Sequence, residues 1–184
     1  MLKYNSPVIL TYTILSFMAL VLSDITGGAA NWLFFSVYRG SPTDPLFYIR
    51  LFTHVFGHVN FEHYFSNFLT ILLIGPMIEE KYGSKSLLKL MVITTLLTGI
   101  LHIILFEAAL LGASGIVFFL ILLSSYANYE KGRIPVTLLL VIGIFLGREL
   151  MSAFTYSDNI ARMTHIFGGV IGAVSGFYYS GKRR

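Results

Sequence analysis

The sequence predicts an all-α, polytopic membrane protein with six transmembrane helices. Of its 184 residues, 55% are apolar and only 12% are charged, about half the charged fraction of roughly 25% found in soluble domains. The mean hydropathy is +0.75. Apolar runs of about twenty residues recur along the chain, and a helix needs about that length to cross a bilayer. These features argue against a soluble protein.

We assign six segments rich in Leu, Ile, Val and Phe as the membrane helices. In chain order they are Pro7 to Ser23, Phe61 to Ile78, Ser86 to Leu105, Ser114 to Tyr126, Ile134 to Met151 and Ile160 to Ser180. The first segment can also be read as a cleaved signal peptide. Its apolar stretch is long for that role, so we favour a retained helix. Residues 1–184 are predicted to form one domain.

Six helices place both termini on the same side of the membrane. In this topology nine of the thirteen Lys and Arg residues share the side of the termini. The positive-inside rule makes that side the cytoplasm. The formal charge of +4 is then explained by topology, and nucleic-acid binding is not expected.

A long outer loop, Asp24 to Gly57, separates the first two helices. It is too long for a bare connection, and its composition predicts short helices lying in the outer membrane interface. The loop is either an aromatic belt or a structure that shields or admits a molecule from the lipid side. Its aromatic residues are Trp32, Phe34, Phe35, Tyr38, Phe47, Tyr48 and Phe52.

Polar residues fall in one layer at membrane depth, where such groups are costly and often functional. With Asn60 as N-cap, His63 and Asn67 lie about 5 and 10 Å below the outer end, on one helix face. The fourth helix is only about 20 Å long in a hydrocarbon core of about 30 Å, so Ser114 begins about 10 Å below the outer surface. His165 lies at a similar depth, which brings Asn67, Ser114 and His165 to one level.

A serine at the start of a helix, beside glycines, suits nucleophilic catalysis. Unpaired N–H groups at a helix start stabilise an oxyanion, and a nearby imidazole can take the hydroxyl proton. Gly168, Gly172 and Gly176 share a face with His165, and a stripe of small residues lets two helices approach closely. Ser114 and His165 are therefore the candidate nucleophile and base.

Other interpretations use the same residues. Small residues around Ser114 can serve packing alone, and Ser, His and Asn near the midplane can bind a solute or relay protons in a transporter or channel. The spacing of His54, His58 and His63 suits a metal site, but without nearby Asp, Glu or Cys we expect a hydrogen-bonded cluster. His102 is interpreted as structural or interfacial. No metal or cofactor is predicted.

Five short stretches add a more specific signal. They are Arg50-Leu-Phe-Thr-His54-Val-Phe-Gly-His58, His63-Tyr-Phe-Ser-Asn67, Gly75 to Gly83 with Glu79, Gly112-Ala-Ser114-Gly115, and His165-Ile-Phe-Gly168 with Gly172. In this order and spacing the chain resembles the rhomboid family of intramembrane serine proteases, in its bacterial six-helix form, across essentially the whole length.

The resemblance implies a serine endopeptidase with Ser114 as nucleophile and His165 as general base. It also implies that His63, Asn67 and the backbone N–H of Ser114 form the oxyanion hole. Supporting roles fall to Arg50 and His58 in the outer loop, Glu79 at the inner end of the second helix, Phe118 under His165, and Gly112, Gly115, Gly168 and Gly172 in the motifs.

The expected substrates are transmembrane segments of other proteins, cleaved near the outer face. The expected location is a prokaryotic inner membrane, with lipid as the surroundings and no cofactor. The chain departs from the family pattern in the backbone leading into the oxyanion hole, in the absence of a hydroxyl under His165, and in the packing before His165. The first two departures remove no catalytic group. Leu111 stands where a second glycine is common, Phe118 where Tyr is common, and Met163 and Thr164 where smaller residues precede the histidine.

Overall fold

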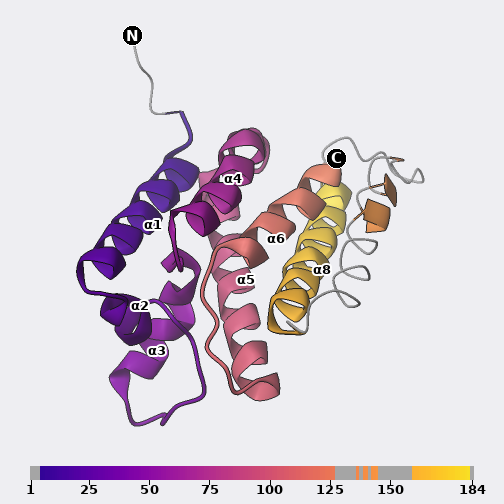
Figure 1. Cartoon of the computed structure of the whole chain (residues 1–184). Helices are drawn as coiled ribbons and strands as arrows, with labels where there is room; N and C mark the ends of the chain where they lie inside the picture. Colours follow the sequence, from indigo (N-terminus) through magenta and orange to yellow (C-terminus); the bar gives the residue numbers. More distant parts are fainter. Residues whose placement is uncertain (1–4, 127–135, 137–138, 141, 145–158, 183–184) are drawn as a thin grey trace.

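The protein is a bundle of helices (Figure 1). The computed structural model describes residues 5–126, 136, 139–140, 142–144 and 159–182. Its named elements are α1 (Pro7–Ile25), α2 (Ala29–Phe34), α3 (Pro45–Thr53), the short 3-10 helix η1 (His54–Phe56), α4 (Phe61–Tyr82), α5 (Ser84–Leu105), α6 (Ser114–Ser125) and α8 (Asn159–Lys182).

Five of the six predicted membrane segments are helices in the structure, and the fifth, Ile134 to Met151, lies largely outside the described residues. The largest change in a boundary is at the end of α4. The predicted helix stops at Ile78, whereas α4 continues to Tyr82 and ends at Gly83, whose φ of 81° breaks the helical path. Helix α5 begins at the next residue.

Local sequence signals set the starts of three helices. Pro7 occupies the first turn of α1, where its missing N–H costs nothing. The Asp44 carboxylate accepts the N–H of Leu46 at 2.9 Å and begins α3. The Asn60 side chain accepts the N–H of His63 at 2.8 Å and begins α4, as the sequence predicts.

Two of the described helices, α1 and α5, are long and apolar enough by themselves to cross a membrane. Helix α6 is apolar but has only 12 residues. Helices α4 and α8 are long enough but carry polar and small residues among their apolar ones. The short α6 agrees with the short fourth span that the sequence predicts, and the helices with the candidate site residues are the less apolar or shorter ones.

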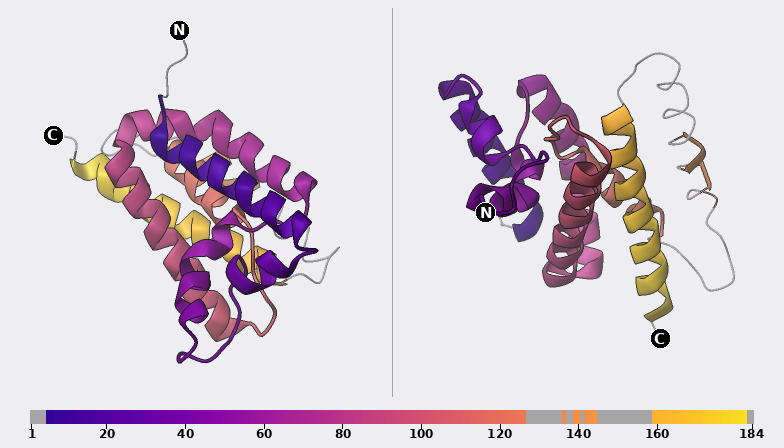
Figure 2. Two further views of the ribbon diagram at one scale, coloured as in Figure 1. Left: turned by 90° about the vertical axis from the view of Figure 1, so that its left-hand side faces the viewer. Right: turned by 90° about the horizontal axis from the view of Figure 1, so that it is seen from below.

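The helix directions place the start of α6 inside the bundle. In Figure 1 the first turn of α1 and the last turn of α8 lie at the same end, at the top of the view. Helix α5 runs away from that end, the chain returns partway without forming a helix, and α6 then runs back toward the top. Helix α6 contacts α4, α5 and α8, and its longest contact is with α8, beside which it lies in both views (Figure 2).

The outer loop contains short helices, as the sequence predicts. Helices α2, α3 and η1 pack against one another and against α1 and α5. A further contact joins this loop to the segment before α6: Val37 and Leu110 exchange two backbone hydrogen bonds, of 2.9 and 2.8 Å. Both residues are buried, as are Gly112 and Ala113, so the part of the segment nearest α6 is covered by protein.

Glu79 joins three helices at the end of the bundle where α1 and α5 begin. Its buried carboxylate accepts the N–H groups of Val8 and Ile9, both at 3.0 Å, and the hydroxyl of Ser84 at 2.7 Å. Two of these donors are otherwise unpaired amides of the first turn of α1. Glu79, which belongs to α4, therefore caps the start of α1 and also contacts α5. The sequence predicted only that it would support the end of its own helix.

Candidate active site

The turn before Ser114 depends on a glycine with a positive φ angle. Gly112 has φ of 126° and donates its N–H to the carbonyl of His54 at 2.9 Å. A Cβ at this position would lie 2.9 Å from Cε1 and 3.0 Å from Nε2 of His63. Glycine is thus required both by the backbone and by the close imidazole. The turn places the His63 ring directly against the backbone that leads into α6.

His58 holds the next residue of the same turn. Its Nε2 accepts the N–H of Ala113 at 3.4 Å, so its Nδ1 carries the proton and donates to the carbonyl of Phe56 at 3.1 Å. The side chain of Asn31 donates to the carbonyl of His58 at 2.8 Å. Burial, aided by the neighbouring His63 imidazole, lowers the pKa of His58 to about 4. His58 is therefore a neutral link between the outer loop and the start of α6.

Helices α6 and α8 touch through backbone at the glycine stripe. A Cβ on Gly168 would overlap the carbonyl oxygen of Gly115 and lie 2.9 Å from its carbonyl carbon. A Cβ on Gly172 would overlap the carbonyl oxygen of Phe119, and one on Gly176 would lie 2.6 Å from the ring of Tyr126. Three successive turns of α8 thus need glycine to reach α6, beginning at the residue next to Ser114.

The close contact brings the His165 turn of α8 to the first turn of α6. The ring of His165 lies against Phe118, with 4.3 Å between ring centroids and an interplanar angle of 36°. Thr164 is buried, and its methyl carbon would lie 3.2 Å from a Cβ on Gly115. The larger residue before the histidine is therefore accommodated because Gly115 has no side chain.

His63 connects the turn and α8. Its imidazole is close enough to that of His165 for the two to interact electrostatically, and its ring centroid lies 4.9 Å from that of His58. Ser114, His63 and His165 are each only partly buried. Each of the three side chains is therefore accessible in part.

Asn67 lies one turn after His63 on α4 and is only 7% exposed. Its side-chain Nδ2 is buried without a hydrogen-bond partner. A buried unpaired donor costs about 1–3 kcal/mol, so such a group in a native protein calls for an explanation. A ligand oxygen in this region is a ready acceptor for it.

Arg50 and Glu79 take no part in this cluster. The buried guanidinium of Arg50 binds the Asp44 carboxylate at 2.7 Å and lies 4.4 Å from the centroid of the Tyr38 ring. The Arg50 hydrogen bond, together with the N–H of Leu46, lowers the pKa of Asp44. Arg50 therefore holds the outer loop together, and Glu79 acts at the end of the bundle where α1 starts.

The remaining histidines also have structural contacts. His54 approaches the Arg50 carbonyl through Nδ1 at 3.2 Å, and His102 approaches the Ala108 carbonyl through Nε2 at 2.6 Å. Within the described ranges, no three His, Asp or Glu side chains gather as metal ligands.

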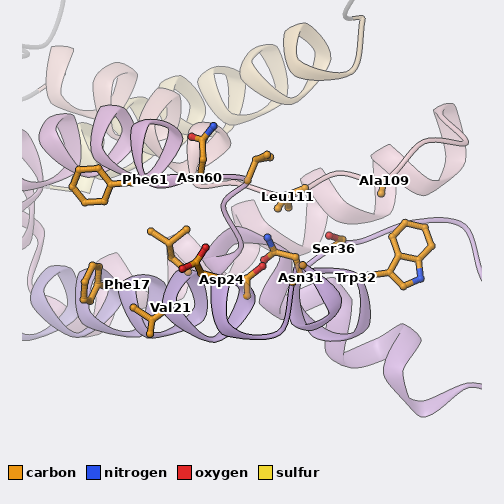
Figure 3. Close-up of a pocket in the computed structure, with 15 residues that line it drawn as sticks. Phe17, Val21, Asp24, Asn31, Trp32, Ser36, Asn60, Phe61, Ala109 and Leu111 are labelled. Atoms are coloured by element: carbon orange, nitrogen blue, oxygen red, sulfur yellow. The ribbon is translucent and has the colours of Figure 1, made fainter.

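A pocket of about 660 Å³ lies beside the Gly112 turn (Figure 3). Asn60 and Leu111 lie on one side of it, and Asp24 and Asn31, from the end of α1 and from α2, face them across the opening. Leu111 is three residues before Ser114. The pocket has both apolar and polar walls, and its lining reaches the segment before α6 but includes none of Ser114, His63, Asn67 and His165.

Sequence reasoning missed three contributors to this region. Val37 pairs with Leu110, and Asn31 binds His58. Gly57 is required because a Cβ there would overlap the Phe35 carbonyl oxygen. The only sequence signal for Gly57 was its position between His54 and His58 in one motif. Val37 and Asn31 gave none, since their partners are distant in the sequence.

The helical fold brings the His63 ring against Gly112 and the His165 ring against Phe118, so both imidazoles lie near the start of α6, where Ser114 stands. Residues 46–182, about three quarters of the chain, match the family model of the Rhomboid domain. The chain therefore belongs to the rhomboid family. This membership makes it an integral membrane protein and an intramembrane protease, a hydrolase.

Three relatives illustrate the similarity. Rhomboid protease GlpG of Haemophilus influenzae is 26% identical over 140 residues, which cover 73% of this chain and 71% of that protein. Rhomboid protease GlpG of Salmonella paratyphi A is 29% identical over 154 residues, covering 77% and 53%. RHOMBOID-like protein 12, mitochondrial, of Arabidopsis thaliana is 27% identical over 150 residues, covering 68% and 44%. The chain thus spans about half the length of the last two.

Proposed function

We propose that this chain is an endopeptidase that cleaves transmembrane segments with a dyad of Ser114 and His165. The observation that carries the proposal is the backbone contact of Gly168 with Gly115. Gly115 follows Ser114 directly, and Gly168 lies one turn after His165, so the contact supports a position of the imidazole close to the hydroxyl. Residues that only packed two helices would not require an adjacent serine and histidine at that point.

The proposed reaction has two steps. The Ser114 Oγ attacks the peptide carbonyl carbon while His165 takes the hydroxyl proton and then gives it to the leaving amine. Water next attacks the acyl carbon while His165 takes one of its protons; the bond from the acyl carbon to Oγ then breaks, and His165 returns the proton to the Ser114 Oγ as the acid product leaves. The negative oxygen of each tetrahedral intermediate receives hydrogen bonds from the Ser114 N–H, the His63 ring and the Asn67 amide. The unpaired Asn67 donor supports this role.

A dyad needs another means of orienting its imidazole, since no carboxylate is proposed to hold it. Phe118 supports one side of the His165 ring. The glycine contact fixes the position of the α8 backbone relative to α6. Together these contacts limit how far the ring can turn or move away from Ser114.

The proposed substrate is a transmembrane segment that unwinds near the outer membrane face. The pocket beside Leu111 has space for an extended peptide, and its polar residues Asp24, Asn31 and Asn60 can bind exposed backbone groups. The partial exposure of Ser114 and His165 supports entry of the water that hydrolyses the acyl-enzyme.

We also propose that both termini are cytoplasmic in a prokaryotic inner membrane. The common end of the first turn of α1 and the last turn of α8 supports this orientation, as does the distribution of basic residues. Reporter fusions after Lys131 and after Arg184 should report cytoplasm, and one inserted near Ser41 should report the outside. An external C-terminus would contradict the orientation and the proposed depth of Ser114.

The decisive experiment combines cleavage with labelling of the serine. Purified protein should cleave a model transmembrane substrate, and a fluorophosphonate should label Ser114. Ser114→Ala and His165→Ala should each abolish cleavage with unchanged melting temperature, and the double variant should be no worse than either single one. Folded protein that is not labelled and does not cleave would favour the transporter or channel alternative.

The same preparations test the oxyanion groups. Removing one such donor typically lowers the rate by about 10²- to 10³-fold, so Asn67→Ala and His63→Ala should retain activity above that of Ser114→Ala, mainly through a lower kcat. A purely structural role predicts a lower melting temperature with normal kcat in the folded fraction. A wild-type kcat in folded Asn67→Ala would therefore rule out its proposed role.

A further inference from the structure

An apolar groove of about 500 Å³ lies between α1 and α5, away from the candidate active site pocket. Most of its wall residues come from the two described helices that are long and apolar enough to cross a membrane, and Phe52, Val55 and Phe56 also line it. Pro7, Tyr12 and Leu15 line it on α1, and Leu88, Val92 and Thr95 line it on α5. Its volume lies within the range of about 300–1,000 Å³ that is usual for ligand sites.

The polar groups on the walls are already satisfied. The Tyr12 hydroxyl donates to the Val55 carbonyl at 2.8 Å, and the Thr95 hydroxyl donates to the Met91 carbonyl at 2.9 Å. The Ser84 hydroxyl donates to Glu79. These hydroxyl groups therefore do not need a polar ligand, and the rest of the groove lining is mostly apolar and suits a hydrocarbon chain.

The groove has the length of one membrane leaflet. Its lining on α5 extends from Ser84 to Thr95, which corresponds to about 17 Å along a helix. Half of the hydrocarbon core of a bilayer is about 15 Å thick. A groove of this length, open along two lipid-facing helices, matches an acyl chain that enters from one leaflet.

The end of the groove at Ser84 is positively charged. Lys85 and Lys89 lie one turn apart on α5, and Lys85 shares a helix face with Leu88 and Val92 of the lining. Both lysines are exposed. Helix α5 begins without a side-chain cap, so the N–H groups of its first turn add to the positive potential.

Two carboxylates of α4 lie at this end, those of Glu79 and Glu80, and Glu80 is exposed. The Glu79 carboxylate is buried and accepts the two α1 amides and the Ser84 hydroxyl. The described residues contain no ion pair of Lys85 or Lys89 with a carboxylate. The two ammonium groups therefore remain available to a phosphate at the level of the lipid headgroups.

We propose that this groove binds an anionic phospholipid, with one acyl chain between α1 and α5 and its phosphate at Lys85 and Lys89. Juxtamembrane basic residues attract anionic headgroups, and the apolar walls bind the chain. The floor of the groove includes the buried core residue Ile116, two residues after Ser114. The bound chain would thus stabilise the packing beneath the start of α6, independently of the peptidase chemistry.

The test is native mass spectrometry of the purified full chain titrated with single lipids. The probes are palmitoyl-oleoyl phosphatidylglycerol, phosphatidylcholine with the same chains, and inorganic phosphate. We expect one tightly held phosphatidylglycerol, weaker phosphatidylcholine binding and no retained phosphate. Equal affinity for the two lipids, or retention of phosphate alone, would overturn the proposal.

Two kinds of variant separate the headgroup from the chain. Each lysine near an anionic headgroup contributes about a fivefold change in affinity, so Lys85→Gln with Lys89→Gln should weaken phosphatidylglycerol binding about 25-fold and leave phosphatidylcholine unchanged. Leu88→Trp should fill the groove and weaken both lipids. The matched controls are Lys81→Gln on α4 and Leu73→Trp, which replaces a leucine that is 66% exposed outside the groove.

A thermal measurement on the same proteins guards against misfolding. Wild type and both controls should melt at a higher temperature with phosphatidylglycerol than without it, because a ligand that binds only the folded state stabilises it. The double lysine variant and Leu88→Trp should melt cooperatively but gain little from the lipid. If the control variants lost the rise in melting temperature with phosphatidylglycerol as fully as the groove variants, the proposed site would be refuted.

Discussion

Adding one methyl group at Gly168 should disable the enzyme by separating two helices. In Gly168→Ala the new Cβ would overlap the Gly115 carbonyl oxygen and lie 2.9 Å from its carbonyl carbon and 3.1 Å from its Cα. Carbon atoms pack at about 3.5–4.0 Å. Both neighbours are backbone and cannot rotate away as a side chain would, so α8 has to move.

The required movement is about 0.4–1.1 Å, the difference between the distances of 2.9 and 3.1 Å and ordinary carbon contacts. Overpacking of this kind costs about 1–3 kcal/mol of stability. A misplacement of about 1 Å between reacting groups can cost about 10²-fold in rate. Because His165 lies one turn from Gly168 and Ser114 is next to Gly115, we expect about that loss in kcat.

The measurement is kcat for a model transmembrane substrate, with the melting temperature of the same sample. Gly172→Ala is the matched variant, because its Cβ would overlap the Phe119 carbonyl oxygen one turn farther from His165. It should lose comparable stability but less activity. Gly143→Ala is the control, since nothing lies within 4 Å of a Cβ there. Normal kcat in folded Gly168→Ala, or an equal loss in Gly172→Ala, would refute the positioning argument.

Two further predictions concern the scaffold. Glu79→Ala should lower the free energy of unfolding by about 1–3 kcal/mol, because it leaves the Val8 and Ile9 amides unpaired; thermal melts should show this with kcat of the folded fraction unchanged. The pKa of Asp44 is lowered because its carboxylate accepts hydrogen bonds from Arg50 and from the N–H of Leu46. The ionised carboxylate therefore stabilises the folded protein above the ordinary pKa of 3.8. This stabilisation is lost as pH falls through the lowered pKa of the folded state. Melting temperature followed as a function of pH should therefore drop less steeply in acid for Asp44→Asn, and identical slopes for the two proteins would contradict the assignment.

The sequence was a good guide wherever a local signal decides the structure. Asn60 predicted the start of α4, and its side chain caps that helix. The start of α6 at Ser114 and the short helices of the outer loop also followed from composition and spacing. These features depend on residues a few positions apart, whose interactions form whatever the rest of the chain does.

The sequence was a weaker guide where an interaction partner lies far along the chain. Glu79 was expected to brace its own helix, but its carboxylate caps α1, 70 residues away. The Val37 bridge to Leu110 and the Asn31 bond to His58 had no sequence signal at all. Such contacts depend on which helices pack together, and periodicity does not specify that choice.

By itself, therefore, the sequence determined that the chain is a helical membrane protein, and it predicts which polar residues share one depth. Composition fixes the solvent that each segment prefers, and helical rise converts position in the sequence into depth. Only the tertiary structure decided that the Gly168 turn touches Gly115 and that His63 rests on Gly112. Depth gives the position of a residue along the membrane normal. Its position in the membrane plane depends on how closely two helix backbones can approach, and that distance depends on atoms from both helices.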